Sequence, residues 1–201
     1  MTESPLTRAS LLIRLRDHAD TDAWSSFLND YGPMLYRFIR SRGLQDADAA
    51  DMVQEVMRSV GLAIDRLDYD KEKGGFRAWL FHITRNRLAT FYEKRKRQGP
   101  VFDDSAIDPS LVIRMQDSEL DQQWELEHQR QLVAQAMDRI QPTVETNTWL
   151  AFEMTAIKDV DADEVAAHLG MTKGAVYVAR SRVTAKLRKE IERMQADESQ
   201  T

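Results

Sequence analysis

The chain has 201 residues, 42% of them hydrophobic, and its 33 acids against 28 Lys and Arg leave a formal net charge of -5. It contains no cysteine, which excludes a disulfide framework and a thiolate zinc site and favours a reducing, cytoplasmic location. No apolar run approaches the roughly 18 residues that span a membrane, and the N-terminus lacks a secretion signal, so we expect neither insertion nor export.

The first part of the chain shows the apolar spacing of three helices. Leu11, Leu12 and Leu15 indicate a short amphipathic helix. Thr21 is predicted to cap a long second helix, which Pro33 kinks and Gly43 ends. Asp46 is predicted to cap a third helix, whose outer face holds polar residues: Asp48, Asp51, Gln54, Glu55 and Arg58.

A loop with paired glycines, "DYDKEKGG" at 68–75, separates these helices from the next one. Phe76, Trp79, Leu80, Ile83 and Leu88 predict a helix that runs into "YEKRKRQ", and Phe76 and Trp79 are expected in its core-facing stripe. Several helix breakers and acids then gather in "RQGPVFDDSAIDPS" at 97–110. We therefore place the main boundary of the chain there.

The remaining chain also has helical periodicity. One helix is predicted from 118 to 140, ending before Pro142, and another from 145 to 157. Alternation typical of strands is absent from the sequence. The predicted fold class is therefore all-α, with two small helical domains.

Residues 161–191 have the pattern of a helix-turn-helix. Val165, Ala166 and Leu169 form an apolar stripe, Gly170 can close the first helix in a left-handed conformation, and Thr172 can cap the second. Such hairpins place the second helix in the major groove of DNA. A helical hairpin that serves only packing is the alternative.

Charge is unevenly distributed. Between 71 and 97 there are nine Lys or Arg against two acids, and between 172 and 193 seven against two. Between 98 and 128 there are eight acids against Arg114 alone. This indicates two surfaces that contact a polyanion, separated by a stretch that avoids it, although solvated helix faces would show similar runs.

Three motifs resemble those of bacterial sigma factors of the sigma-70 family. "DMVQE" at 51–55 is similar to the helix that docks on the polymerase clamp, and "FRAWLFHITRNRLATFYEKRKR" at 76–97 to the helix that melts and reads the minus-10 element. "EVAAHLGMTKGAVYVARSRVTAKLR" at 164–188 looks like the domain that reads the minus-35 element. Because the 98–117 stretch is too short for a further domain, the best match is the extracytoplasmic-function group.

The resemblance implies a domain organisation and a function. It implies a region 2-like domain at 1–97, an acidic linker at 98–117 and a region 4-like helix-turn-helix domain at 118–195. The function would be promoter-specific initiation of transcription. The implied partners are the clamp and flap of core RNA polymerase, promoter DNA and an anti-sigma factor.

The resemblance also assigns site residues. Core polymerase would contact Asp51, Met52, Gln54, Glu55 and Arg58. The minus-10 element would contact Tyr69, Lys71, Lys73, Arg77, His82, Arg85, Asn86, Arg87, Tyr92, Lys94 and Arg95. The minus-35 element would contact Thr172, Lys173, Tyr177, Arg180, Ser181, Arg182 and Lys186.

Other functions fit the residues less well. The four histidines are scattered and no phosphate-binding or activated-serine motif occurs, so we expect no enzyme, catalytic residue, cofactor or metal. A carboxylate metal site at Asp48, Asp51 and Glu55 would lack a nearby histidine. Two alternatives remain: a helix-turn-helix regulator that binds duplex DNA as a dimer, and an adaptor that binds polymerase without DNA.

Overall fold

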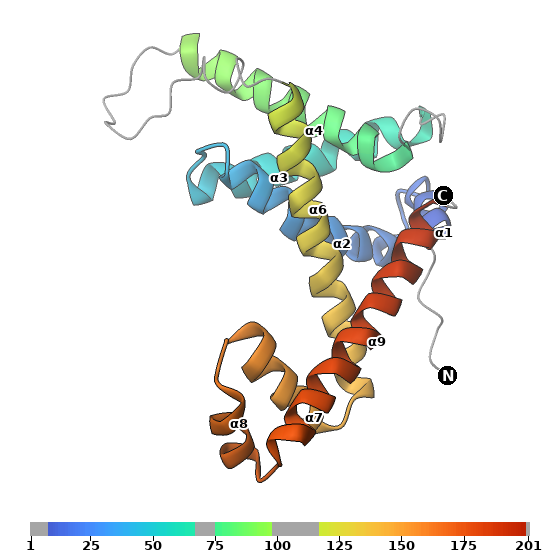
Figure 1. Ribbon diagram of the computed structural model, residues 1–201. Helices are drawn as coiled ribbons and strands as arrows, with labels where there is room; N and C mark the ends of the chain where they lie inside the picture. Colours follow the sequence, from blue (N-terminus) through green and yellow to red (C-terminus); the bar gives the residue numbers. More distant parts are fainter. Residues whose placement is uncertain (1–7, 67–74, 98–116, 200–201) are drawn as a thin grey trace. The chain divides into compact units, whose positions relative to one another are not determined.

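A computed structural model describes residues 8–66, 75–97 and 117–199, and every regular element in these ranges is helical (Figure 1). The all-α prediction is confirmed. The chain divides into two compact units, Met1–Gln131 with Asp197–Thr201, and Leu132–Ala196. Among the described helices, none has the length and apolar character needed to cross a membrane. The expected linker at 98–117 lies outside the described residues except for its last position.

The first unit is built on four consecutive helices: α1 (Arg8–Leu15), α2 (Thr21–Arg40), α3 (Asp46–Ala63) and α4 (Gly75–Arg97). A 3-10 turn, Ile64–Arg66, follows α3. Helix α2 packs against α1 and α3, and α3 packs against α4. Their apolar stripes meet in one core, whose largest fully buried side chains include Phe27, Phe38, Met34, Leu35, Ile39 and Leu80.

The start of α2 differs from the prediction by one residue. Asp20, not Thr21, is the N-cap, and its carboxylate accepts a hydrogen bond from the Ala23 amide at 2.9 Å. Arg14 holds the same carboxylate with two bonds of 2.6 and 2.7 Å. The Arg14 hydrogen bond, followed by the Ala23 amide, lowers the pKa of Asp20. Helix α2 then continues through Pro33.

The connection from α2 to α3 also differs in detail. Helix α2 ends at Arg40, and Gly43 adopts a left-handed conformation with φ of 86° shortly afterwards. Gln45, not Asp46, precedes α3 and makes no side-chain cap bond. The Asp46 carboxylate instead accepts from the Tyr36 hydroxyl at 3.1 Å and lies 2.8 Å from Arg40 Nε. Asp46 therefore joins two helices rather than capping one.

Helix α6 (Asp117–Ile140) begins in the first unit and ends in the second. Leu120 and Trp124 belong to the core of the first unit. The unit therefore extends to Gln131, whereas the expected second domain began at residue 118. The physical reason is that the first half of α6 has its own apolar face, which packs on α2 and α4.

The second unit contains the end of α6, a 3-10 turn (Gln141–Thr143), α7 (Thr146–Phe152), α8 (Ala162–Leu169) and most of α9 (Lys173–Ser199). The helix expected to reach residue 157 is α-helical only to Phe152 and continues as a π-helical turn, Glu153–Ile157. Glu145 caps α7 by accepting from two amides, which lowers the pKa of its carboxyl.

Helices α8 and α9 form the predicted helix-turn-helix. Gly170 ends α8 in the left-handed conformation, with φ of 64°. The Thr172 hydroxyl accepts from the Ala175 amide at 3.2 Å, as expected of a cap. Val176 and Val183 on α9 are completely buried, so the opposite face of this helix is exposed.

Candidate functional site

Polar side chains follow the outer face of α3. Asp51, Gln54 and Arg58 are exposed and Glu55 is half-buried, and Arg58 donates to the Glu55 carboxylate. Their spacing of three and four residues puts them on one side of the helix. We call these four residues the α3 ridge. Met52 was expected here too, but only 5% of it is exposed because it packs into the core.

The exposed face of α4 is cationic. His82, Arg85, Asn86 and Lys94 are exposed, and Arg95 is half-buried. His82 and Asn86 lie on the side of the helix away from the buried Thr84 and Leu88, whereas Arg95, seven residues after Leu88, lies on the same side as Leu88 in the last turns of the helix. We call this surface the α4 face. Arg87 is half-buried beside it and donates to the Ser59 hydroxyl of α3 at 2.6 Å, so it also fixes the packing of the two helices.

Tyr92 does not lie on the α4 face. It is 4% exposed, and its hydroxyl donates to the backbone carbonyl of Arg42 at 2.6 Å. Burial raises the pKa of Tyr92 to about 12. In the structure the side chain joins α4 to the turn after α2, and the expected contact of Tyr92 with DNA stays a prediction.

Arg77 lies on α4 but already has intramolecular partners. Its Nη2 is 3.1 Å from a Glu125 carboxylate oxygen, and its Nη1 is 2.9 Å from His128 Nδ1. Both partners belong to α6. Three other residues expected to contact the minus-10 element, Tyr69, Lys71 and Lys73, lie outside the described residues.

The exposed side of the α9 N-terminal half presents the remaining expected residues. Tyr177 is 52% exposed, and Arg180, Ser181, Arg182 and Lys186 are exposed as well. Thr172 acts as the cap of α9, so its hydroxyl has a structural role.

Two expected lysines have partners. Lys173 Nζ donates to Asp163 of α8 at 2.8 Å, and this bond raises the pKa of Lys173. Lys186 donates to the Thr143 carbonyl at 3.3 Å. Val178, next to Tyr177, is 48% exposed, which was not predicted from the sequence. Its position about 200° around the helix axis from the buried Val176 could have indicated this exposure.

A surface cavity of about 460 Å³ opens beside the α3 ridge, and sequence reasoning missed it too. It is lined by His18, Trp24, Met57, Arg58, Gly61, Leu62 and Asp65. Leu62 is 74% exposed at its edge. In the described part of the chain, no three His, Asp or Glu side chains gather as metal ligands would, the α3 carboxylates included.

Comparison with known proteins finds similarity to sigma factors. Residues 27–98, which carry both the α3 ridge and the α4 face, match the family described as Sigma-70 region 2. The RNA polymerase sigma factor CnrH of Cupriavidus metallidurans is 28% identical over 168 residues, covering 82% of this chain and 84% of CnrH. Residues 27–98 are thus similar to region 2 of sigma-70 factors, and most of the chain is similar to one sigma factor.

A solved structure of CnrH in complex with the cytosolic domain of CnrY is also similar. It is 21% identical, covers 90% of this chain and 95% of that chain, and has a TM-score of 0.34.

Proposed function

We propose that this protein is a sigma factor, which directs core RNA polymerase to promoters by holding the enzyme with its first unit and two DNA elements with its two units. The observation that carries the proposal is that one sigma-70 region 2 segment bears the α3 ridge and the α4 face, and that a helix-turn-helix follows it. Each surface has the chemistry that its partner requires.

The α3 ridge suits a protein partner. It alternates acceptor, amide and cationic side chains on one helix face, and polar groups of this kind pair across wet, transient interfaces. We propose that it docks on the polymerase clamp through Asp51, Gln54, Glu55 and Arg58. The flap of polymerase would contact the second unit.

The α4 face suits nucleic acid. Cations beside an amide donor can contact phosphates and the edges of unpaired bases, which is what a melted minus-10 element offers. We propose that His82, Arg85, Asn86, Lys94 and Arg95 contact it. Arg77 and Arg87 would join them, because their guanidinium groups belong to the same helix.

The exposed side of α9 suits duplex DNA. In a helix-turn-helix the first turns of the second helix reach base edges, while flanking cations contact phosphates. We propose that Tyr177, Ser181 and Arg182 face the minus-35 element and that Lys173, Arg180 and Lys186 contact its backbone. Each bidentate base contact would contribute about 1–3 kcal/mol of discrimination.

Transcription reconstituted from core polymerase, this protein and a matched promoter tests the proposal. We expect initiation that requires both promoter elements, since tethering both units to one enzyme raises the local concentration of each at its element. A dimeric helix-turn-helix regulator would give no initiation. An adaptor would initiate equally well with Arg180→Ala and Arg182→Ala.

Substitutions on the α3 ridge test docking separately. Gln54→Ala with Glu55→Ala should weaken polymerase capture in a pull-down at least tenfold while leaving thermal unfolding nearly unchanged, because neither side chain belongs to the core. Asp138→Ala, an exposed acid in the second unit, is the control. Equal capture by the ridge variant and the control would contradict the docking assignment.

Substitutions on α9 test promoter reading. Replacing Lys173, Arg180 and Arg182 by Ala should reduce minus-35 dependence more than holoenzyme formation, because these side chains are exposed. An equal loss of both would show that the domain had merely lost its fold.

We also propose an anti-sigma protein as a further partner, which would cover the polymerase-binding and DNA-binding surfaces. The complex in the CnrH structure contains the cytosolic domain of CnrY. For this chain, purification of a tagged copy from cells tests the proposal. Recovery of a partner protein with the tagged chain, but not with the tag alone, would support it.

A further inference from the structure

The first half of α6 covers part of the surface that the proposed function assigns to DNA. We call residues 117–131 the acidic segment, because they contain five acids and a single arginine. The whole segment belongs to the first compact unit. Its contacts with α2 and α4 are a small apolar centre flanked by ion pairs.

Trp124 forms the apolar centre. It is 4% exposed, and its ring centroid lies 5.1 Å from Phe38 of α2 and 5.2 Å from Phe81 of α4. The first pair meets edge to face, a favourable arrangement for aromatic rings. Leu120, one turn earlier, is also buried in this core.

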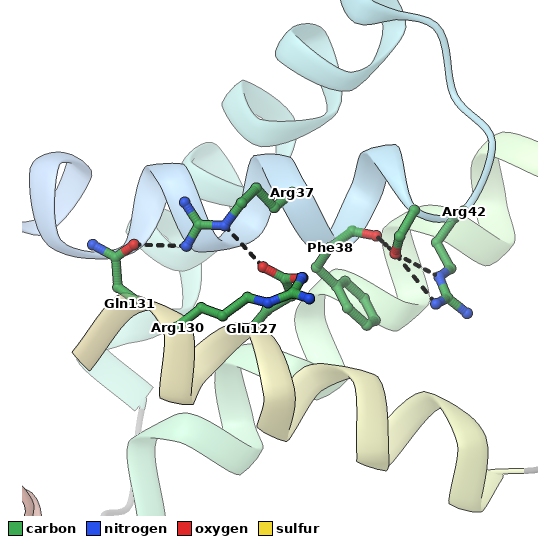
Figure 2. Close-up of polar contacts among 7 residues, drawn as sticks. Arg37, Phe38, Arg42, Glu127, Arg130 and Gln131 are labelled. Atoms are coloured by element: carbon green, nitrogen blue, oxygen red, sulfur yellow. Dashed lines mark hydrogen bonds and ion pairs between the residues drawn. The ribbon is translucent and has the colours of Figure 1, made fainter. Parts of the chain in front are cut away.

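Ion pairs lie on both sides of Trp124. Figure 2 shows Arg37 of α2 donating to Glu127 at 2.8 Å and to Gln131 at 2.9 Å. Arg130 of the acidic segment donates to the same Glu127 at 2.6 Å. On the α4 side, Glu125 and His128 hold the two ends of the Arg77 guanidinium.

These contacts compete with a DNA phosphate for Arg77. Bidentate binding of phosphate uses parallel N–H groups of one guanidinium, and in this structure each terminal nitrogen of Arg77 already has a partner in the acidic segment, which holds the group in a fixed orientation. The five acids also repel phosphate over a screening length of about 8–10 Å. Arg77 is therefore fully available to DNA only when the segment moves away.

The same contact surface contains two buried polar atoms without a hydrogen-bond partner in the described part of the chain, which is rare in a permanent core. Trp124 Nε1 and Gln123 Oε1 are buried and find no hydrogen-bond partner among the described residues. Buried polar groups in stable interiors are almost always paired, because an unpaired group loses its hydration without compensation. Opening the contact would return both groups to water, which lowers the cost of opening.

We propose that the acidic segment is a reversible internal cover: it occupies the α2 and α4 surface in the free protein and leaves it when DNA and polymerase bind. The inference rests on the proposed function for the role of Arg77. The cover reduces DNA affinity in proportion to the fraction of molecules that are open. It thereby lowers binding to unrelated nucleic acid before polymerase is bound.

The first test changes the ion pairs of the cover. Glu125→Gln with Glu127→Gln should bind a fluorescent single-stranded DNA oligonucleotide about fivefold to tenfold more tightly than wild type in low-salt anisotropy measurements. Glu119→Gln with Asp121→Asn is the matched control. It removes the same charge from exposed positions of the same segment. Equal gains in both double variants would overturn the proposal, because charge alone would explain them.

The second test locks the cover. The natural chain has no cysteine, so Arg37→Cys with Glu127→Cys introduces its only thiols at two positions whose side chains meet. Bridging them with a bis-maleimide that contains a reducible disulfide should reduce single-stranded DNA binding and polymerase-dependent transcription at least tenfold. Reduction of the linker should restore both. The same variant labelled with a monofunctional maleimide is the control.

Full activity of the bridged protein would overturn the proposal. If no form of the protein drives transcription, the proposed function fails, but the DNA-binding measurement still decides about the cover because it uses no polymerase. Equal DNA binding by the bridged and the monofunctionally labelled protein would then exclude a cover.

Discussion

Tyr92 of α4 provides a direct test of whether a residue that was expected to contact DNA stabilises the fold instead. Its hydroxyl is buried and donates to the Arg42 carbonyl at 2.6 Å. We expect Tyr92→Phe to destabilise the first unit by about 1 kcal/mol at neutral pH, since the buried carbonyl loses its donor. DNA affinity should remain within twofold of wild type. A tenfold loss of affinity in a folded variant would mean that the side chain contacts DNA after all.

The pH dependence of stability offers a sharper form of the same test. The pKa of Tyr92 rises from 10.0 to about 12 on folding because burial disfavours the phenolate. A raised pKa stabilises the fold at full strength below pH 10, and that contribution disappears as pH rises through 12. At 1.36 kcal/mol per pKa unit, the loss is about 2–3 kcal/mol.

Urea unfolding followed by circular dichroism at pH 9 and pH 12 would measure this loss. The wild-type free energy of unfolding should fall by about 2–3 kcal/mol more than that of Tyr92→Phe, in which all other groups titrate alike. Parallel curves for the two proteins would refute the assignment of Tyr92 to the interior.

Three further outcomes are expected from unfolding experiments. Gly170→Ala should destabilise the second unit by about 1 kcal/mol in thermal unfolding, since its φ of 64° is strained for alanine although no atom lies within 4 Å of the added carbon. Asp20→Ala should lower the melting temperature by losing the α2 cap, whereas exposed Asp22→Ala should not. The hydrogen bond to Arg193 lowers the pKa of Glu190, so ionised Glu190 should stabilise the fold above the ordinary pKa of a glutamate, and this stabilisation should be lost as pH falls through the lowered pKa. In Glu190→Gln the free energy of unfolding should therefore fall less at acid pH than in wild type.

Local signals carried much of the prediction. The turn between α8 and α9 follows from Gly170 and Thr172, whose preferences act on their own backbone and need no distant partner. Helix extents were also close, as for α6, because apolar spacing reports which face of a helix is buried. Cap positions were predicted less accurately. Asp20 caps α2 in place of the predicted Thr21, and its carboxylate also accepts a hydrogen bond from Arg14.

The burial of two expected site residues could have been predicted from the apolar spacing of their helices. Tyr92 lies one turn after Leu88 and two turns after Thr84, and all three are buried. Met52 likewise belonged to the apolar stripe of its helix. Helix phase predicted the burial at these positions, because a residue on the apolar stripe of a helix faces the core.

The sequence by itself determined the all-helical class, the helix-turn-helix and the alternation of basic and acidic stretches, because each depends on spacing within a few turns. Only the tertiary structure decided that Trp124 packs between Phe38 and Phe81, and that Glu125 holds Arg77. These partners are tens of residues apart along the chain. No periodic pattern encodes which of several acidic and basic faces will meet, since that choice depends on the shape of the core that brings them together.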